Sequence, residues 1–360
     1  MSPITPHQSL QLALDIKAWG KALGFQQVGI TDVDLQEHGP RLQSWLKKNY
    51  HGEMYYMGDH GDKRYRPEKL VPDTLRIITV RMDYMAPDVQ TLTVLDNPKQ
   101  AYISRYALGR DYHKLMRKRL AQLGKKIETH LETLNLKVGY RAFVDSAPVL
   151  ERGLAQKSGQ GWIGKNAMLI NPKAGSYFFL GELFTDLPLP VDAPYTDMNC
   201  GSCTACIEVC PTGAIVDNHI VDGRKCVSYL TIELKGSIPE DLRPKMGNRI
   251  FGCDDCQLFC PWNKFSSPTA EADFTPRHQL DSASLLELFS WDENTFLSKT
   301  EGTPIRRAGH ERWLRNIAVA LGNAPSDPEI QQALQARLSF DSELVQEHIH
   351  WALAQQARSS

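Results

Sequence analysis

The chain has 360 residues, of which 42% are hydrophobic and 23% are charged, a balance typical of globular proteins with two or three domains. The formal net charge is −1, which excludes a strongly positive overall field, so any nucleic-acid partner must be held by a local basic patch. No apolar run reaches the about 20 residues that span a bilayer, and residues 1–11 lack the pattern of a signal peptide. The sequence therefore predicts a soluble, cytoplasmic protein.

Helices and strands alternate through the first half of the chain. Apolar residues at helical spacing predict the helices; Gly24 ends the first of them and Pro148 begins the last. β-Branched and aromatic runs predict the strands, and the last two strands are expected to pair with each other. This alternation predicts an α/β or α+β domain over residues 1–190. The expected helices cover residues 8–23, 41–50, 111–134 and 149–159, and the expected strands cover residues 24–32, 75–85, 140–145, 167–172 and 176–187.

All eight cysteines lie between Cys200 and Cys260, after a proline-rich linker over residues 187–197. Thiols stay reduced in a cytoplasm, so this clustering indicates metal binding rather than disulfides. The first four have the spacing C-x2-C-x2-C-x3-C-P, in which three cysteines of a bacterial ferredoxin bind one [4Fe–4S] cluster and the fourth binds a second cluster. Zinc is the weaker alternative, because its sites typically use two widely separated cysteine pairs.

The second cysteine run is incomplete. It repeats only the last three positions of the pattern, and Ile250 stands where the leading cysteine would be. Cys226, between the two runs, is the remaining candidate for the missing ligand. This predicts a ferredoxin-like module with two clusters over residues 191–268. The first cluster takes Cys200, Cys203, Cys206 and Cys260, and the second takes Cys210, Cys226, Cys253 and Cys256.

The C-terminal part, residues 269–360, is expected to be helical. Helices are predicted over residues 282–298 and 309–322, and two more follow a break at residues 323–328. A faint repeat favours stacked, HEAT-like helix pairs, although such repeats usually have periods of roughly 40–47 residues, and a plain helical bundle explains the pattern equally well. The expected fold is α+β, with an α/β N-terminal domain, a ferredoxin-like centre and a helical C-terminal region.

Four segments closely resemble the bacterial epoxyqueuosine reductases, and the likeness extends over nearly the whole chain. No GxGxxG motif supports a dinucleotide site. The resemblance implies a monomeric enzyme whose N-terminal domain binds cobalamin. Two [4Fe–4S] clusters, fed by an unidentified low-potential donor, would supply electrons to reduce epoxyqueuosine to queuosine at the wobble position of a tRNA anticodon. The segments are SRYALGRDYHKL (104–115), FVDSAPVLERGLAQKSGQGWIGKNAMLINP (143–172), CVSYLTIEL (226–234) and MGNRIFGCDDCQLFCPWNK (246–264).

Asp145 is the predicted general acid. From the residues alone, an aspartate between a strand and a helix is more often an N-cap. The resemblance at VDSAP places the family's acid on this position, where it would protonate the epoxide oxygen. An acid that works near neutrality needs a raised pKa, and burial against an apolar corrin face is expected to supply that rise.

The resemblance also implies contacts to cobalamin, without a histidine ligand to cobalt. The string from Asp111 through His113 to Met116 lacks the glycine of the usual corrin-binding Asp-x-His-x-x-Gly motif. For each implied contact a structural role is an open alternative, such as a cap, a solvated charge or a core side chain. The implied contacts are Arg64, Ser104, Asp145, Trp162, Ile163, Gly164, Leu169, Leu180, Ser228, Cys253 and Asp254.

Two basic segments are the candidate tRNA-binding surface, although charge runs are often only solvated faces. Phosphate contacts would position the anticodon loop, and the wobble base would leave its stack to react. The alternatives to this enzyme are another corrinoid iron–sulfur reductase and a ferredoxin-type electron carrier; a carrier would leave the first 190 residues unexplained. The candidate tRNA contacts are Arg243, Lys245, Arg249, Arg306, Arg307, Arg312 and Arg315.

Overall fold

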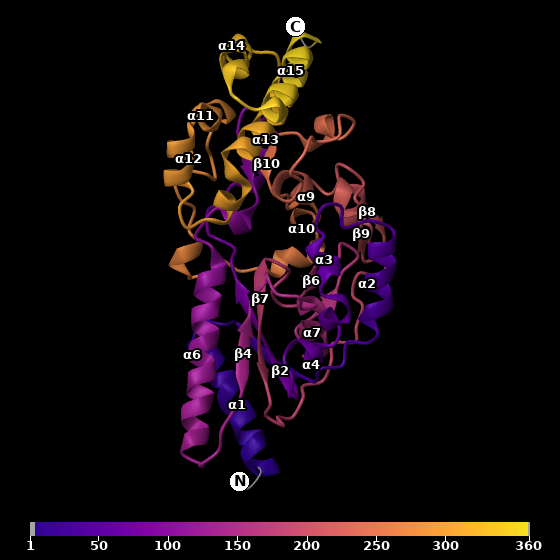
Figure 1. The fold of residues 1–360 in the computed structure, drawn as a ribbon, viewed down its shortest axis with the longest axis vertical. Helices are drawn as coiled ribbons and strands as arrows, with labels where there is room; N and C mark the ends of the chain where they lie inside the picture. The colour runs from indigo at the N-terminus through magenta and orange to yellow at the C-terminus, as the bar shows by residue number, and fades with distance from the viewer. Residues whose placement is uncertain (1–3, 359–360) are drawn as a thin grey trace.

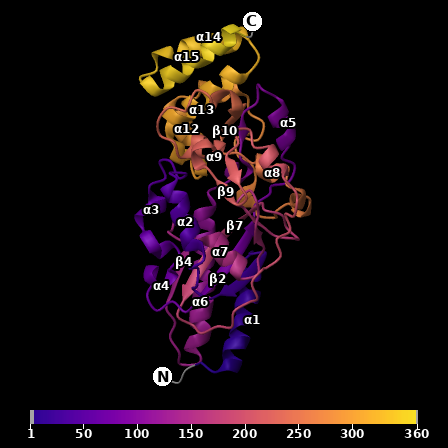
Figure 2. The same cartoon turned by 90° about the vertical axis from the view of Figure 1, so that its right-hand side faces the viewer.

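The computed structural model describes residues 4–358. The molecule is elongated, with the N-terminal sheet and its helices at one end and the C-terminal helices at the other (Figure 1). Figure 2 shows the last two helices lying across the end of the molecule opposite the N-terminus. Within residues 4–358, no helix is both long and apolar enough to cross a membrane.

A four-stranded antiparallel sheet organises the first half of the chain. Its order is β1-β2-β7-β4, so β7 lies between β2 and β4. An antiparallel sheet with helices on its faces makes this part α+β rather than α/β. The predicted pairing of the last two strands is wrong, because β6 pairs with β5 whereas β7 pairs with β2 and β4. The strands are β1 (Gln27–Thr31), β2 (Arg76–Asp83), β4 (Tyr140–Phe143), β5 (Trp162–Ile163), β6 (Leu169–Ile170) and β7 (Phe178–Thr185).

Alternating side chains of the sheet enter two different cores. Ile78 of β2 and Leu183 of β7 pack with the long helices α1 and α6, whereas Ile77 and Phe184, one position away on each strand, pack on the opposite face with Leu154 of α7. This follows from the two-residue period of a strand. The helices of this half are α1 (Pro6–Ala22), α2 (His38–Lys47), α3 (Tyr56–Asp59), α4 (Pro67–Leu70), α5 (Thr91–Asp96), α6 (Tyr112–Glu132) and α7 (Glu151–Lys157).

The cysteine segment contains two short helices that contact each other, α8 with Cys206 and α10 with Cys256. This pairing agrees with the pseudo-symmetry expected from the spacing of the cysteines. β10 pairs in parallel with β3, which joins this segment to the first half of the chain. The elements are β3 (Tyr102–Ile103), α8 (Ala205–Glu208), β8 (Ile215–Asp217), β9 (Ile220–Val221), α9 (Val227–Ile232), β10 (Arg249–Phe251) and α10 (Asp255–Leu258).

The C-terminal helices surround α13, which packs against α11 and α15 and also against β10. One hydrophobic core therefore continues from the cysteine segment into these helices. The helix predicted over residues 282–298 is two helices, because the chain turns at Trp291 and Asp292 caps the second of them. The elements are α11 (Leu285–Ser290), α12 (Glu293–Lys299), α13 (Gly309–Asn323), α14 (Pro328–Ala336) and α15 (Glu343–Arg358).

Candidate active site and cysteine centres

Asp145 lies in the loop after β4, with a backbone φ of 54°. Aspartate is one of the few residues that adopt this left-handed conformation readily. The loop is held by Glu151, whose Oε1 accepts the backbone N–H of Asp145 at 2.7 Å. The alternative reading of Asp145 as an N-cap is wrong, because α7 begins at Glu151 and its N-cap position is Leu150.

The carboxylate of Asp145 is held by one of its two oxygens. Oδ2 accepts a hydrogen bond from the Tyr112 hydroxyl at 3.0 Å and lies 2.9 Å from Nε2 of His113. Within the described residues, no hydrogen bond engages Oδ1, and the side chain is 54% exposed. One oxygen is therefore fixed while the other is free to meet a substrate.

The first turn of α6 presents these two partners. Asp111 caps the helix by accepting the backbone N–H of His113, and its Oδ1 also lies 2.6 Å from Nδ1 of the same histidine. Arg307, from the C-terminal region, donates to the other oxygen of Asp111 at 2.6 Å. The buried imidazole of His113 thus bridges two carboxylates, Asp111 behind it and Asp145 in front.

This arrangement sets the protonation of the site. Burial alone would lower the pKa of His113, but the hydrogen bonds that its ring makes to the carboxylates of Asp111 and Asp145 outweigh burial and raise the pKa. Burial would raise the pKa of Asp145, but His113, Tyr112 and Arg307 outweigh it and lower the pKa. In the chain by itself the nearby donors therefore favour the ionised form of Asp145, and the rise expected from burial against a corrin face stays a prediction. The same histidine lowers the pKa of Asp111 to about 2, against the effect of burial.

Two carboxyl groups behind the loop favour their protonated forms. Glu182, in the middle of β7, is fully buried and lies beside the carboxyl group of Glu151. Burial and the neighbouring Glu151 hold the pKa of Glu182 well above its usual value. Burial and Asp145 raise the pKa of Glu151 to about 7.

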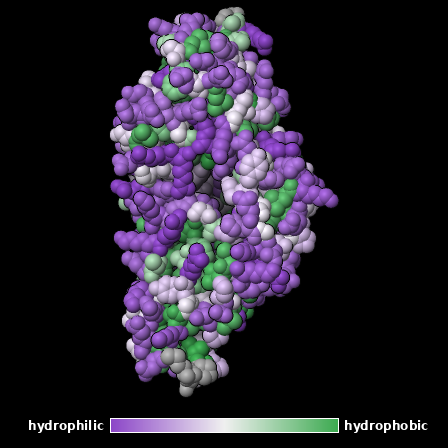
Figure 3. Space-filling view, viewed as in Figure 1, coloured by the Kyte–Doolittle hydropathy of each residue, from purple (hydrophilic) through white to green (hydrophobic). Residues whose placement is uncertain are grey.

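Further ionisable groups face Asp145 from other parts of the chain. The pKa of Glu233, which follows α9, is raised overall. Burial and the charge of Asp145 raise it, and Arg312 and Arg307 offset only part of the rise. Burial and the charge of Asp145 also raise the pKa of Tyr106. The site therefore lies where the sheet, the cysteine segment and the C-terminal helices meet. Figure 3 shows that this face of the molecule is hollowed at mid-height, between its two ends.

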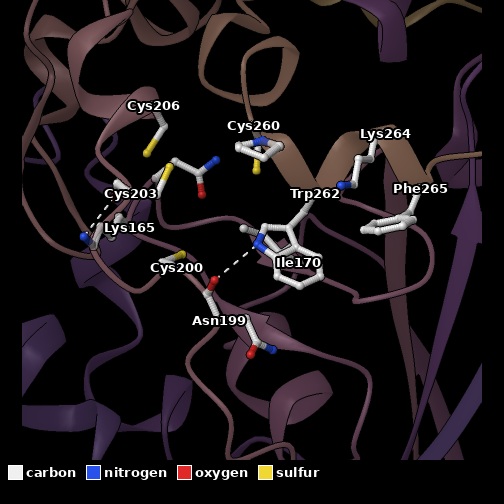
Figure 4. A pocket seen from close by; sticks show the side chains of 12 residues that line it. Lys165, Ile170, Asn199, Cys200, Cys203, Cys206, Cys260, Trp262, Lys264 and Phe265 are labelled. Atoms are coloured by element: carbon white, nitrogen blue, oxygen red, sulfur yellow. Dashed lines mark hydrogen bonds between the residues drawn. The ribbon is translucent and has the colours of Figure 1, made fainter.

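The first predicted quartet of cysteines borders one cavity of about 330 Å³. Figure 4 shows Cys200, Cys203, Cys206 and Cys260 around this cavity, from segments 60 residues apart at their extremes. Burial raises the pKa of Cys206 to about 11, and the three other thiols of the quartet contribute to that rise. These thiols are therefore close neighbours, as the predicted ligand set requires.

The second predicted quartet is Cys210, Cys226, Cys253 and Cys256. Besides burial, Cys226 and Cys210 raise the pKa of Cys256, and Cys226 raises that of Cys253. Cys226 and Cys253 also pack against the core of the C-terminal helices. Ile250, at the position of the absent cysteine, is fully buried in that core. Cys226 is therefore near enough to Cys253 and Cys256 for its charge to affect both thiols, and its place in the second ligand set stays a prediction.

The residues with implied cobalamin contacts have several different surroundings. Asp254 is buried and accepts hydrogen bonds from Tyr102, Ser104 and the backbone of Arg105. The hydroxyl of Ser104 and the carboxylate of Asp254 are therefore hydrogen-bonded to each other. Trp162 is buried, with Nε1 3.4 Å from Sγ of Cys200. Leu169 and Leu180 belong to a small hydrophobic core, and Gly164 packs on Ile170. Ile163 and Ser228 are half-buried.

Arg64 and Cys253 complete this set. Arg64 is 5% exposed and its Nε has no hydrogen-bond partner among the described residues, so it is a buried donor with unused capacity. Such a group commonly indicates a missing polar ligand. Cys253 lies in the second quartet, where its thiol contacts Asp255 at 2.6 Å.

Several predicted tRNA contacts are corrected by the structure. Arg315 is fully buried and donates to the backbone carbonyls of residues 230, 234 and 236. Arg243 is 4% exposed and bonds Glu347 and the carbonyl of Ile238, so neither guanidinium can reach a phosphate. Arg249 pairs with Asp255, and Arg312 bonds three backbone carbonyls. Lys245, Arg306 and Arg307 remain exposed.

Sequence reasoning missed the partners of Asp145. Tyr112 and His113 were visible only as part of an incomplete corrin motif, and Glu151 and Glu182 as ordinary residues of a helix and a strand. A usable signal existed in Asp111, because an aspartate before an amphipathic run commonly caps a helix, and a cap places the next residues at the helix N-terminus.

Comparisons with known proteins agree with these observations. A family described as "Epoxyqueuosine reductase QueG, DUF1730" matches residues 64–146, and a "4Fe-4S double cluster binding domain" matches residues 199–263. The epoxyqueuosine reductase of Pseudomonas aeruginosa is 59% identical over 350 residues, covering 97% of this chain and 96% of that protein. The enzyme of Escherichia coli is 60% identical over 346 residues, covering 96% of this chain and 90% of that protein.

Solved structures show the same fold over nearly the whole chain. An epoxyqueuosine reductase crystallised with an epoxyqueuosine-modified tRNA-Tyr stem loop is 26% identical, with a TM-score of 0.86, 96% of this chain and 90% of that chain covered. The Bacillus subtilis enzyme, solved with a catalytic aspartate loop swung out of its active site, is 27% identical, with a TM-score of 0.85, 96% of this chain and 90% of that chain covered. This chain is a member of the epoxyqueuosine reductase family of oxidoreductases.

Proposed function

We propose that this chain reduces epoxyqueuosine to queuosine in a tRNA anticodon, using cobalamin and two [4Fe–4S] clusters. The observation that carries the proposal is the Asp145 carboxylate, fixed through Oδ2 and free at Oδ1 at the junction of the three parts of the chain. The modified stem loop bound to a structural relative supports the same substrate class here. Removal of an epoxide oxygen as water takes two electrons and two protons, so the site must deliver both.

The two cysteine quartets fit the clusters. Each supplies four thiols; all four of the first quartet and three of the second come from the two runs of the ferredoxin-type pattern, and Cys226 completes the second quartet. The two groups would lie side by side, because α8 and α10, which carry one ligand of each, are in contact. When bound, such clusters supply single electrons at low potential.

Several buried polar atoms of the chain also fit cobalamin. Arg64 Nε, Arg105 Nε and the Tyr177 hydroxyl are buried polar atoms without partners among the described residues, and a corrin presents many amide oxygens that could accept from them. Both ring nitrogens of His113 are engaged by carboxylates, which supports a cobalt without a ligand from this histidine. When bound, cobalamin supplies a strongly reducing metal that accepts single electrons.

The proton is handled by the chain's own residues. Because the pKa of Asp145 is lowered and that of His113 is raised, a proton shared by the pair rests on the imidazole rather than on the carboxylate. Nε2 of His113 can pass it across 2.9 Å to Oδ2 of Asp145, and rotation of the carboxyl group, which is free at its other oxygen, then turns the new O–H to the epoxide oxygen. Asp111 stabilises the imidazolium from behind, and Arg307 keeps Asp111 ionised. The buried pair of Glu151 and Glu182 holds the loop through the backbone of Asp145.

In this proposal each of the three parts of the chain has its own role. Residues 1–190 form the cobalamin-binding domain, residues 191–268 carry the clusters, and residues 269–360 form a HEAT-like helical region that contributes Arg307 and Arg306. The enzyme acts as a monomer in the cytoplasm, and exposed Lys245 and Arg306 contact the tRNA backbone.

Anaerobic turnover of an anticodon stem loop that contains epoxyqueuosine tests this function. Protein reconstituted with iron, sulfide and cobalamin, and supplied with a chemical reductant, should convert the nucleoside to one with one oxygen atom fewer by mass spectrometry. Protein reconstituted without cobalamin is the control. Equal conversion with and without cobalamin, or no conversion of the stem loop by fully loaded protein, would contradict the proposal.

A further inference from the structure

We propose that the surface over the first cysteine quartet is the docking site for a small acidic electron-carrier protein. This inference rests on the proposed function, because it assumes that the quartet holds a cluster. It goes further by assigning the face at which electrons enter and the charge of the protein that brings them.

The two quartets differ in their access to solvent. Cys203 is exposed, and the loop of residues 201–204 that contains it is exposed throughout. A side chain added at Gly201 would meet nothing within 4 Å, so open space lies directly outside this loop. Cys226 and Cys253 of the second quartet instead pack against the C-terminal core. Electron transfer weakens steeply with distance, so a carrier would reach the first quartet and not the second.

The charged side chains that line the cavity of this quartet are positive, whereas Asp197 and Glu208 are exposed on the neighbouring segments outside it. The cavity lining includes Lys165 and Lys264 and contains no carboxylate (Figure 4). Lys264 is exposed, and Lys165 donates to the backbone carbonyl of Cys203 at 2.9 Å, which places its charge at the loop over the thiols. Glu208, the acidic residue of α8, accepts a hydrogen bond from Thr204 and does not line the cavity. The local charge therefore favours an acidic partner, although the whole chain is nearly neutral.

Apolar side chains are also exposed on the segments that carry these thiols. Met198, Phe259 and Phe265 are 49%, 46% and 42% exposed, unlike the great majority of large apolar residues in this chain. Phe265 lines the cavity, and Lys264 lies over its ring at 4.9 Å from Nζ to the ring centroid. Aromatic residues and methionine are enriched in protein interfaces, and charged side chains such as these lysines belong to the polar rim of an interface.

The electron balance is simple. In each encounter the carrier is oxidised by one electron and the iron–sulfur group held by the exposed quartet is reduced by one. Two encounters supply the two electrons that the epoxide requires, and the two protons come from the Asp145 side of the molecule. A flavodoxin, an acidic protein with a flavin carrier, has this chemistry and serves as the probe.

Cluster reduction followed by stopped-flow absorbance tests the surface without any RNA. Reduced flavodoxin should reduce the Lys264→Glu variant about three- to tenfold more slowly than wild type at low ionic strength, and the difference should shrink at high salt. Lys126→Glu on α6, an exposed lysine far from the cysteines, makes the same change of net charge and should have no effect. Reduction by dithionite should be equal in all three proteins.

Ser202, exposed in the loop over the thiols, allows a second test in both directions. Ser202→Glu should slow reduction by flavodoxin and weaken its binding in titration calorimetry, whereas Ser202→Lys should do the opposite. Equal rates for Lys264→Glu and wild type, or Ser202 variants that do not separate by charge, would overturn the proposal. A loss that appears equally with dithionite would show cluster damage and would also overturn it. If stem-loop turnover fails with dithionite while flavodoxin still docks as described, the proposed function fails and the docking site stands.

Discussion

Replacing Asp145 by asparagine separates proton transfer from structure. Asparagine adopts the left-handed conformation that residue 145 requires, and its amide oxygen can still accept from Tyr112 and His113. The change removes the charge that faces the protonated imidazole of His113. Hydrogen bonds to charged groups contribute about 1.5–3 kcal/mol, and the half-exposed position of this carboxylate reduces that, so a loss of about 1 kcal/mol of stability is expected.

Activity should fall much further than stability. An amide cannot present a carboxylic proton to the epoxide oxygen, so turnover of the stem loop should decrease by roughly two to four orders of magnitude. Single-turnover conversion under anaerobic conditions, measured by mass spectrometry of the nucleoside, gives the rate. Thermal unfolding, iron content and cobalamin binding of the same preparation should stay close to wild type.

Tyr112→Phe is the matched control, because it removes one hydrogen bond to the same oxygen and leaves the carboxyl group in place. Its rate should fall far less than that of Asp145→Asn. If the two variants lose activity equally, the position of the loop matters and the proton does not come from Asp145. Near-normal turnover by Asp145→Asn would refute the reasoning outright.

Four further outcomes are expected. His113→Gln should remove the alkaline limb of the pH–rate profile. The raised pKa of His113 keeps this proton donor charged at low pH, and the charge is lost as pH rises through that pKa. An unchanged alkaline limb would exclude His113 as the proton donor to Asp145. By the same linkage, the His113 contribution to stability is present below the ordinary histidine pKa and lost above the raised one. Glu182→Gln should make the protein relatively more stable at pH 9 than at pH 6, because a raised carboxyl pKa costs stability as pH rises; equal melting shifts at both pH values would contradict this. Cys226→Ala should retain about four of eight irons, with the first cluster intact by electron paramagnetic resonance, and retention of all eight would disprove the quartets. Arg306→Ala should weaken stem-loop binding and lower its salt slope by about one, with Lys126→Ala as the neutral control, and an unchanged slope would leave Arg306 a solvated charge.

The cysteine centres could be predicted because their information is local. Short spacers bring Cys200, Cys203 and Cys206 around one point whatever the rest of the chain does, and the repeat in the second run identifies the exchanged ligand, Cys260. The same holds for the helix expected over residues 111–134, which the structure places at 112–132, because its apolar period and its aspartate cap are both local.

The surroundings of Asp145 could not be predicted in this way. Arg307 reaches Asp111 across 196 residues of sequence, and Glu182 enters the site only because β7 lies between β2 and β4. Charge patterns also fail for buried arginines. Arg315 resembles its exposed neighbours in the sequence, but backbone carbonyls that no pattern reveals satisfy its guanidinium.

In the proposed mechanism, protons and electrons arrive through different elements. Protons would reach Asp145 from the first turn of α6, where Asp111 and His113 are fixed by Arg307. Electrons would enter past Cys203, on a loop that forms no hydrogen bond to those residues within residues 4–358. Because the two routes share no side chain, each can be impaired alone: a variant of His113 should leave cluster reduction unchanged, and a variant of Lys264 should leave the pH profile unchanged when dithionite replaces the carrier. A reaction that needs two protons and two electrons can therefore be limited by either supply, and the reductant used in the assay decides which one is measured.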